Sequence, residues 1–380
     1  MAECIFNDLC GGCSFRNLDI SDYQRQKQEN LQKILRPLSD QNFIFEKPVF
    51  IGDGNRRRAS MAFEMKKGKL VLGFNAKHSN EISDIEHCIM LSPQINKALP
   101  FIRKLVSEIC AQRIATTTKK KKVVYTTVEK GDIWITQADN GLDLVLEFSE
   151  SVTLDMREIV FEKLSAQDQI IRVSHRRSPS EQPEVIMEKI KPFITISGYE
   201  VYIPAGTFLQ PSKAGENSLI DIVKKYLGEV SGKVADLFCG VGTFSYSLAG
   251  KKGVKIVAVD CSSELLAGFQ ASINKQMLSN IEIINRNLFK YPLSGDELNG
   301  FFAIVFDPPR SGAMTQVEAI VKLSEEQRPQ KLVAVSCNPN TFVRDAKTLI
   351  DGGYRLKKIT MVDQFVYSLH SELVALFEKN

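Results

Sequence analysis

The sequence predicts an α/β protein in three parts, and three observations lead to this prediction. Three cysteines lie within the first 13 residues. Short strand patterns separated by turns, with two helical patterns among them, occupy residues 42–205. From residue 206 onward, apolar strands alternate with helices, as in a doubly wound sheet. We therefore expect a cysteine-bearing segment over residues 1–40 together with Cys88, a small α+β domain over 41–205, and a doubly wound α/β domain over 206–380.

The composition is that of an ordinary globular chain. Of the 380 residues, 43% are hydrophobic and 25% are charged, and the formal net charge is +4. No apolar run approaches the ~18 residues that a bilayer-spanning helix needs, so we expect a cytoplasmic protein without membrane contact. Because disulfides are rare in the cytoplasm, the 8 cysteines are expected in the core, at a metal or in catalysis. The basic runs at residues 56–58, 119–122 and 175–177 are either solvated faces or phosphate contacts.

The N-terminal cysteines have the spacing of a metal site. Cys10 and Cys13 are separated by two glycines, which let the backbone fold tightly enough for both thiols to face one centre. Cys4 is a third ligand candidate, and Cys88 is the natural fourth. Four thiolates fit an iron–sulfur cluster or a structural zinc, and His87 beside Cys88 leaves a Cys3His zinc site open. Unligated cysteines are the remaining interpretation.

The middle of the chain is expected to form a sheet with two helices. A polar helix over residues 22–36, ending before Pro37, precedes it. The strand containing residues 56–58 could present guanidinium groups to phosphates, or these arginines could simply decorate a surface edge. The expected strands are residues 58–64, 69–74, 133–136 and 142–148, and the expected helices are residues 92–110, 154–166 and, after a join at 206–211, 214–227.

A glycine-rich turn follows the first strand of the C-terminal part. Asp236 precedes Gly240 and Gly242, whose lack of a Cβ lets the backbone approach a ligand closely. The next strand ends at Asp260, the position where a ribose diol is usually held. Because Ser245 stands where a dinucleotide fingerprint needs a third glycine, the turn indicates an adenosyl cofactor without a pyrophosphate.

Two further strands end in candidate site residues. Residues 302–306 are followed by Asp307 and two prolines, and residues 332–335 are followed closely by Cys337. The carboxyl ends of parallel strands share one sheet edge, where ligands bind, so both side chains are expected there. Taken alone, Cys337 is either a buried small hydrophobe or a nucleophile. Strands over residues 354–361 and 372–377 complete the sheet.

Four motifs in this order, D-L-F-C-G-V-G, D-P-P-R, S-C-N-P and H-S-E, resemble the S-adenosylmethionine-dependent RNA 5-methyluridine methyltransferase family over nearly the whole chain. R-R-R-A and F-L-Q, ending at Gln210, are also similar to the family. The cysteine set and the lack of room for an extra N-terminal β-barrel resemble its short iron–sulfur 23S rRNA branch. One departure is Ser212, where members usually carry an asparagine two places after the glutamine. This departure puts a substrate or cofactor contact in question.

The resemblance implies a Rossmann-like methyltransferase domain and roles for residues of this sequence. Cys337 would attack C6 of a uridine in RNA, and Glu372 would remove the C5 proton. The remaining residues form two implied sets. Those expected at S-adenosylmethionine and the uracil edge are Gln210, Asp236, Gly240, Gly242, Asp260 and Asp307, and those expected at a [4Fe–4S] cluster are Cys4, Cys10, Cys13 and Cys88.

The expected substrate is 23S rRNA, with tRNA as the alternative, and the expected state is a monomer. Two rival functions remain open on the sequence. D-P-P also suits an amino methyltransferase acting on an exocyclic nitrogen, which would not need Cys337. A non-catalytic iron–sulfur RNA-binding protein is the rival from another class, and the intact Asp260, Asp307, Cys337 and Glu372 argue against it.

Overall fold

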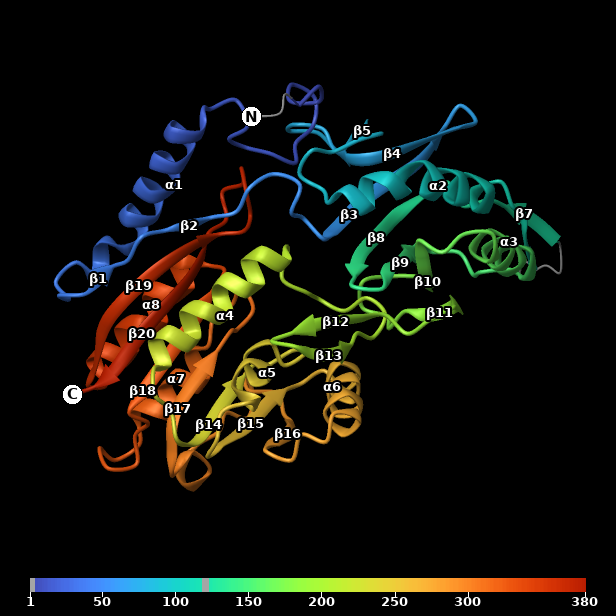
Figure 1. Cartoon of the computed structure of the whole chain (residues 1–380). Coiled ribbons are helices and arrows are strands. Elements are labelled where there is room, and N and C mark those ends of the chain that lie inside the picture. Colours follow the sequence, from blue (N-terminus) through green and yellow to red (C-terminus); the bar gives the residue numbers. More distant parts are fainter. Residues whose placement is uncertain (1–3, 118–122) are drawn as a thin grey trace. The chain divides into compact units, whose positions relative to one another are not determined.

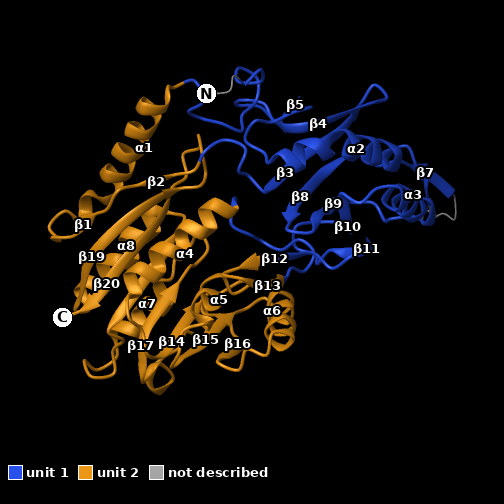
Figure 2. Ribbon diagram, in the orientation of Figure 1, with its two compact units in different colours: residues 1–17, 52–194, 202–212 blue, residues 18–51, 195–201, 213–380 orange. Residues whose placement is uncertain are grey.

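The computed structural model describes residues 4–117 and 123–380, which form two compact units (Figures 1 and 2). Unit 1 comprises residues 1–17, 52–194 and 202–212, and unit 2 comprises residues 18–51, 195–201 and 213–380. The expected segment 1–40 is therefore divided between the two units. The lysine run 119–122 lies outside the described residues. No helix in the described part of the chain is long and apolar enough to cross a membrane.

Unit 2 contains a mixed sheet whose strand order reverses at β14. The order is β1-β19-β20-β18-β17-β14-β15-β16, and β2 also pairs with β19. Strands β14 to β18 run parallel, whereas β20 is antiparallel to both of its neighbours. The strands are β1 (Ile44–Phe45), β2 (Val49–Phe50), β14 (Gly232–Leu237), β15 (Val254–Asp260), β16 (Ile281–Asn285), β17 (Phe301–Phe306), β18 (Lys331–Ser336), β19 (Tyr354–Asp363) and β20 (Glu372–Lys379). This confirms the predicted alternation; β1, β2 and β16 were not predicted.

Helices pack against this sheet and close its core. They are α1 (Ile20–Leu35), α4 (Lys213–Leu227), α5 (Thr243–Ala249), α6 (Ser263–Lys275), α7 (Met314–Val321) and α8 (Pro339–Asp351), with short 3-10 turns η1 (Arg36–Leu38) and η2 (Gly295–Leu298). Asp19 caps α1 by accepting a hydrogen bond from the Asp22 amide. Leu31 and Leu35 of α1 are buried in the same core as the sheet strands, and burying each leucine contributes about 1.5–3 kcal/mol. This burial explains why α1 belongs to unit 2 and not to a cysteine-bearing segment.

Unit 1 is a seven-stranded sheet with two helices packed on it (Figure 1). The order is β11-β10-β9-β8-β3-β4-β5, antiparallel except between β9 and β10. The predicted strands and helices are present. The elements are β3 (Arg58–Lys66), β4 (Lys69–Asn75), β5 (Ile82–Asp84), β8 (Lys130–Ala138), β9 (Gly141–Glu147), β10 (Ile170–Arg176), β11 (Glu184–Glu188), α2 (Pro93–Cys110) and α3 (Leu154–Ser165), with a hairpin of β6 (Ile114–Thr117) and β7 (Val123–Thr126). A further hairpin, of β12 (Phe193–Ile196) and β13 (Tyr199–Tyr202), contains residues of both units.

Two arginines of the basic run 56–58 are used inside unit 1. Arg57 is 4% exposed, and its Nε donates to the carbonyl oxygen of Gln210 at 2.9 Å. Arg58 donates to the Leu209 carbonyl at 3.0 Å and lies over the exposed Phe208 ring at 4.7 Å. Both arginines thus hold the loop around Gln210 in place. Arg57 is too deeply buried to face a phosphate, whereas a phosphate contact of Arg58, which is only partly buried, stays a prediction.

Candidate active site

Three predicted site residues meet at the carboxyl edge of the unit 2 sheet. Asp307 directly follows β17, and Cys337 directly follows β18. The two strands are parallel, with Phe306 opposite Ala334. Glu372 opens β20, which runs antiparallel to β18 with Leu373 opposite Ser336. The pairing therefore brings the ends of three strands to one edge, although Glu372 lies 35 residues from Cys337 in sequence.

Glu372 is a buried acid held by one amide. Its side chain is 2% exposed, and Gln364 Nε2 donates to its Oε2 at 3.0 Å. Burial, and then the negative charge of Asp307, raise the pKa of Glu372 to about 8. Its other oxygen, Oε1, is buried and has no hydrogen-bond partner among the described residues. An acid with a pKa near neutrality and an unused oxygen can exchange a proton with a bound substrate.

Cys337 is half-buried beside these carboxylates. Burial raises its pKa to about 11, and the charges of Glu372 and Asp307 act in the same direction while Arg310 opposes them. The thiol is therefore protonated at neutral pH in the absence of substrate. Asn338 Nδ2 donates to the Arg310 carbonyl at 2.9 Å, which ties the S-C-N-P turn to the D-P-P-R loop.

The glycine turn after β14 contains two glycines with positive φ, Gly240 and Gly242. Gly242 caps α5 with φ of 88°, and a Cβ there would lie 2.5 Å from the Phe269 ring. Gly240 also has positive φ, and a Cβ there would meet nothing within 4 Å. Its amide donates to Asp260 Oδ2 at 2.9 Å, so the ends of β14 and β15 are linked. The open side of Gly240 leaves space for a ligand against the backbone.

Asp236 explains why a serine stands in place of the third glycine. Ser245 donates to Asp236 Oδ2 from its amide at 2.8 Å and from its hydroxyl at 2.6 Å. Asp236 is fully buried, which raises its pKa to about 7, and its Oδ1 has no hydrogen-bond partner among the described residues. A buried acid with an unused oxygen, next to an open glycine turn, fits a small cofactor with a cationic group. S-adenosylmethionine is such a molecule.

An open cavity lies beyond Asp260 on the same edge. It is lined by residues that follow β15 and β16, among them Cys261, Asn285 and Arg286, and by the exposed Tyr291. The order of the strands places it on the β16 side of the glycine turn. An adenosine held at Asp260 would have room here.

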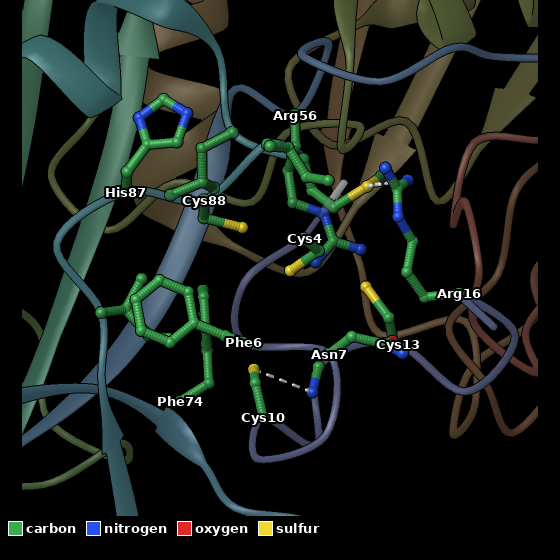
Figure 3. A pocket seen from close by; sticks show the side chains of 15 residues that line it. Cys4, Phe6, Asn7, Cys10, Cys13, Arg16, Arg56, Phe74, His87 and Cys88 are labelled. Carbon is green, nitrogen blue, oxygen red and sulfur yellow. Dashed lines mark hydrogen bonds between the residues drawn. The ribbon is translucent and has the colours of Figure 1, made fainter. Parts of the chain in front are cut away.

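The four N-terminal candidates line a single cavity in unit 1 (Figure 3). The cavity measures about 60 Å³, several times the roughly 10–15 Å³ that one water needs. In Figure 3 the sulfur atoms of Cys4, Cys10, Cys13 and Cys88 turn towards the space between them, and the His87 ring points away from it. Burial, followed by the neighbouring Cys88, raises the pKa of Cys13 to about 11. Cys88, the predicted fourth ligand, thus lines the same cavity as the other three cysteines, and its role as a ligand stays a prediction.

These thiols do not form a closed metal site as they stand. No group of three or more His, Cys, Asp or Glu side chains within residues 4–117 and 123–380 has positions that could hold a metal ion. All four cysteines are free thiols. The Gly11 amide, between Cys10 and Cys13, donates a hydrogen bond to the Asn75 carbonyl at 2.8 Å. The donor set itself, four thiols around one cavity, fits a cluster or zinc once the thiols are deprotonated.

Comparison with known proteins decides the family. Residues 21–380 match the model of the tRNA (uracil-5-)-methyltransferase family. The chain belongs to this family. It is an S-adenosylmethionine-dependent RNA methyltransferase acting at C5 of uracil. The family match therefore favours methylation of uracil C5 over the amino-methyltransferase interpretation of D-P-P and over the non-catalytic interpretation.

Named relatives differ in their RNA. An uncharacterized RNA methyltransferase of Agrobacterium fabrum is 34% identical over 98% of this chain and 83% of its own length. A 23S rRNA (uracil(1939)-C(5))-methyltransferase RlmD, from Edwardsiella ictaluri, is 29% identical over 99% of this chain and 81% of its own. The Pyrococcus abyssi tRNA (uracil-54, C5)-methyltransferase, solved with S-adenosyl-L-homocysteine, matches with a TM-score of 0.71 at 22% identity, over 97% of this chain and 86% of that one. At this identity the last match shows a shared fold.

Within this uracil methyltransferase, some residues were missed by sequence reasoning. Gln364 was not singled out, because nothing local marks its contact with Glu372, eight residues later. Phe238, in the glycine turn, has φ of 60°, an uncommon value for a bulky residue, and no residue pattern indicates it. Gln210, by contrast, was predicted; it lies in unit 1, and the other cofactor candidates lie in unit 2. Its contact with the cofactor stays a prediction.

Proposed function

We propose that this enzyme methylates C5 of one uridine in 23S rRNA, with Cys337 as the nucleophile and Glu372 as the base. The observation that carries the proposal is the meeting of Cys337, Asp307 and buried Glu372 at one sheet edge. The relatives named RlmD support 23S rRNA. Because C5 lies within a base stack in an RNA helix, we expect the target uridine to be in a loop or flipped out.

The chemistry requires covalent activation, because C5 of uracil is a poor nucleophile. The Cys337 thiol loses its proton to solvent, the thiolate adds to C6, and the electrons of the C5–C6 double bond move to give an enolate. S-adenosylmethionine, when bound, supplies an electrophilic methyl group, which C5 takes. Glu372 then removes the C5 proton, the C5–C6 double bond forms again, and the bond from C6 to sulfur breaks to release the thiolate.

The environment of Glu372 suits the last step of this sequence. A base must be ionised to accept a proton. A pKa of about 8 leaves only a minor fraction of Glu372 ionised at neutral pH, but it makes that fraction a stronger base than an ordinary carboxylate. The unpartnered Oε1 gives it an atom that can take the proton. Asp307 would orient the uracil edge from the same sheet edge.

The cofactor would be held by the turn after β14 and by the end of β15. Gly240 and Gly242 would bring the backbone close to it, Asp236 would face its cationic end, and Asp260 would receive the ribose hydroxyls. Gln210 would add a contact from its own loop. Ser212, the departure from the family pattern, pairs with Arg56 in an isolated β-bridge, which is a backbone contact that does not explain the serine side chain.

We also propose that Cys4, Cys10, Cys13 and Cys88 bind a [4Fe–4S] cluster. The support is their placement around one cavity and the outward orientation of His87, which disfavours a Cys3His zinc site (Figure 3). Bound there, the cluster would join the N-terminal loop to the turn containing Cys88. Anaerobically purified protein should contain about four irons per chain. Cys13→Ser should lose them, and Cys110→Ser, in helix α2 away from the cavity, should keep them.

The activity is tested by incubating the purified protein with S-adenosylmethionine carrying a labelled methyl group and with unmodified 23S rRNA or tRNA. Labelled 5-methyluridine in 23S rRNA is the expected product, and labelling of tRNA alone would replace the proposed substrate with tRNA. Cys337→Ala should be inactive. Glu372→Gln should accumulate an RNA adduct that survives denaturation. Methyl transfer by Cys337→Ala would refute covalent activation and restore the amino-methyltransferase interpretation.

A further inference from the structure

The loop that leads into Glu372 carries two of its neighbours. Strand β19 ends at Asp363 and β20 begins at Glu372, so residues 364–371 connect them. Gln364, the first residue of this loop, donates to Glu372 Oε2 at 3.0 Å. His370, near its end, lies 3.1 Å from Arg310 of the D-P-P-R loop, measured from Nε2 to Nη2. The position of Glu372 therefore depends on how this loop is held.

Lys27 of helix α1 holds the loop at three points. Its Nζ forms an ion pair with Asp363 Oδ1 at 3.0 Å and donates to the Ser368 carbonyl at 2.8 Å and to the His370 carbonyl. The side chains of Lys27 and Asp363 are 2% and 0% exposed. Burial lowers the pKa of Lys27, and the charge of Asp363 opposes this effect. A lysine this deeply buried is not an ordinary surface charge.

Tyr23, one helical turn earlier, holds the same loop by a second route. Its hydroxyl donates to Asp363 Oδ2 and accepts a hydrogen bond from the Tyr367 amide at 2.9 Å. Its ring packs against the Tyr367 ring, with centroids 4.6 Å apart. The i, i+4 spacing places Tyr23 and Lys27 on the same face of α1. Together the two side chains reach the beginning, the middle and the end of the loop.

We infer that Lys27 and Tyr23 are positioning residues for the base: they fasten the loop of residues 364–371 so that Gln364 and Glu372 keep the geometry needed for proton removal. The inference rests on the proposed role of Glu372. Neither side chain is required to touch RNA or cofactor. Both act through Asp363 and the loop backbone.

The order of the chemical steps gives this role a distinctive signature. Glu372 acts after Cys337 has added to C6 and after the methyl group has arrived. A displaced base therefore slows release of the product, while formation of the covalent intermediate continues. The methylated RNA should then stay attached to Cys337. A defect that merely unfolded the protein would reduce adduct and product together.

The test compares Lys27→Met and Tyr23→Phe with Lys189→Met. Lys189 is a matched control because it also donates to two backbone carbonyls, of Leu164 and Gln167, and to one carboxylate, of Asp168, but within unit 1. Turnover on the RNA substrate, KM for that RNA, the fraction of RNA in a denaturation-resistant adduct, and thermal unfolding are measured for each protein.

Both test variants should lose about tenfold or more in kcat, since small misplacements of catalytic groups cost up to roughly a hundredfold. Their KM should fall together with kcat, so that kcat/KM changes by less than about threefold, and their adduct fraction should rise. Lys189→Met should match wild type. Unchanged kcat in folded Tyr23→Phe, or loss of adduct in step with loss of product, would overturn the inference. Tyr23→Phe keeps the test valid if Lys27→Met does not fold.

Failure of the proposed function would give a different result from failure of the positioning role alone. If wild type makes no 5-methyluridine, or if Glu372→Gln turns over at the wild-type rate, Glu372 is not the base and the inference falls with it. If wild type is active and Glu372→Gln traps the adduct, but both α1 variants behave as wild type, only the positioning role is refuted.

Discussion

Replacing Asp236 with asparagine should stabilise unit 2 above neutral pH and destabilise it in acid. Asp236 has a pKa of about 7 in the folded chain, compared with 3.8 for an ordinary aspartate. The folded state therefore binds the proton more tightly than the unfolded state does. Wild type loses stability as the pH rises from about 4 to about 7, by on the order of 4 kcal/mol in total. The asparagine side chain carries no charge at any pH, so the free energy of unfolding of the variant would not fall by this amount.

The size of the effect follows from the contacts of Asp236. An asparagine oxygen can accept both hydrogen bonds from Ser245, and its NH2 then occupies the place of Oδ1, which has no partner among the described residues. An unsatisfied buried amide costs about 1–3 kcal/mol at any pH. We therefore expect Asp236→Asn to be about 1–3 kcal/mol more stable than wild type at pH 8, and about 1–3 kcal/mol less stable near pH 4.

Urea unfolding between pH 4 and pH 9 measures this difference. Far-ultraviolet circular dichroism follows the whole chain, while the single tryptophan, Trp134 in strand β8, follows unit 1 and serves as an internal control. If the curves of stability against pH for wild type and Asp236→Asn cross, the reasoning is supported. Parallel curves, or a less stable variant at pH 8, would show that Asp236 is not a buried acid with a raised pKa. The same variant should bind S-adenosylhomocysteine more weakly, measured by calorimetry, because it lacks the negative charge.

Three further predictions concern the catalytic residues and the glycine turn. The decay rate of the covalent adduct, measured in a single turnover, should rise with pH up to about 8 and then level off, because the raised pKa of Glu372 leaves this base protonated below that value; a decay rate independent of pH between 6 and 9 would contradict this. Glu372→Gln should increase iodoacetamide labelling of Cys337 at pH 9 by about threefold to tenfold, because the lost carboxylate charge had raised the pKa of the thiol; equal labelling would show that the two groups do not interact. Gly242→Ala should reduce the free energy of unfolding by about 2–4 kcal/mol, since a left-handed residue would clash with the Phe269 ring, whereas Gly240→Ala, with open space at its Cβ, should lose only about 1–2 kcal/mol in chemical denaturation.

Local patterns were enough to predict the alternating strands and helices of unit 2, the main strands and the two helices of unit 1, and the edge at which Cys337 and Asp307 lie. The reason is geometric: parallel strands place their carboxyl ends together, so a residue that directly follows a buried strand is located without knowledge of the fold. The glycine-rich turn was also recognised from the sequence, because only glycine lacks a Cβ and allows the positive φ that Gly240 and Gly242 adopt at little cost. The cysteine spacing likewise indicated that Cys10 and Cys13 lie together, and both line one cavity with Cys88.

Long-range pairing was decided only by the tertiary structure. Lys27 and Tyr23 lie on a polar helix whose charges look solvated in the sequence, yet their partner Asp363 is more than 330 residues away. In the sequence, Arg57 and Arg58 suggest a basic surface, but in the structure they donate hydrogen bonds to backbone carbonyls inside unit 1. In each case a polar side chain is buried with partners from distant segments. Burial depends on which segments pack together, and residue spacing along one segment carries no information about that.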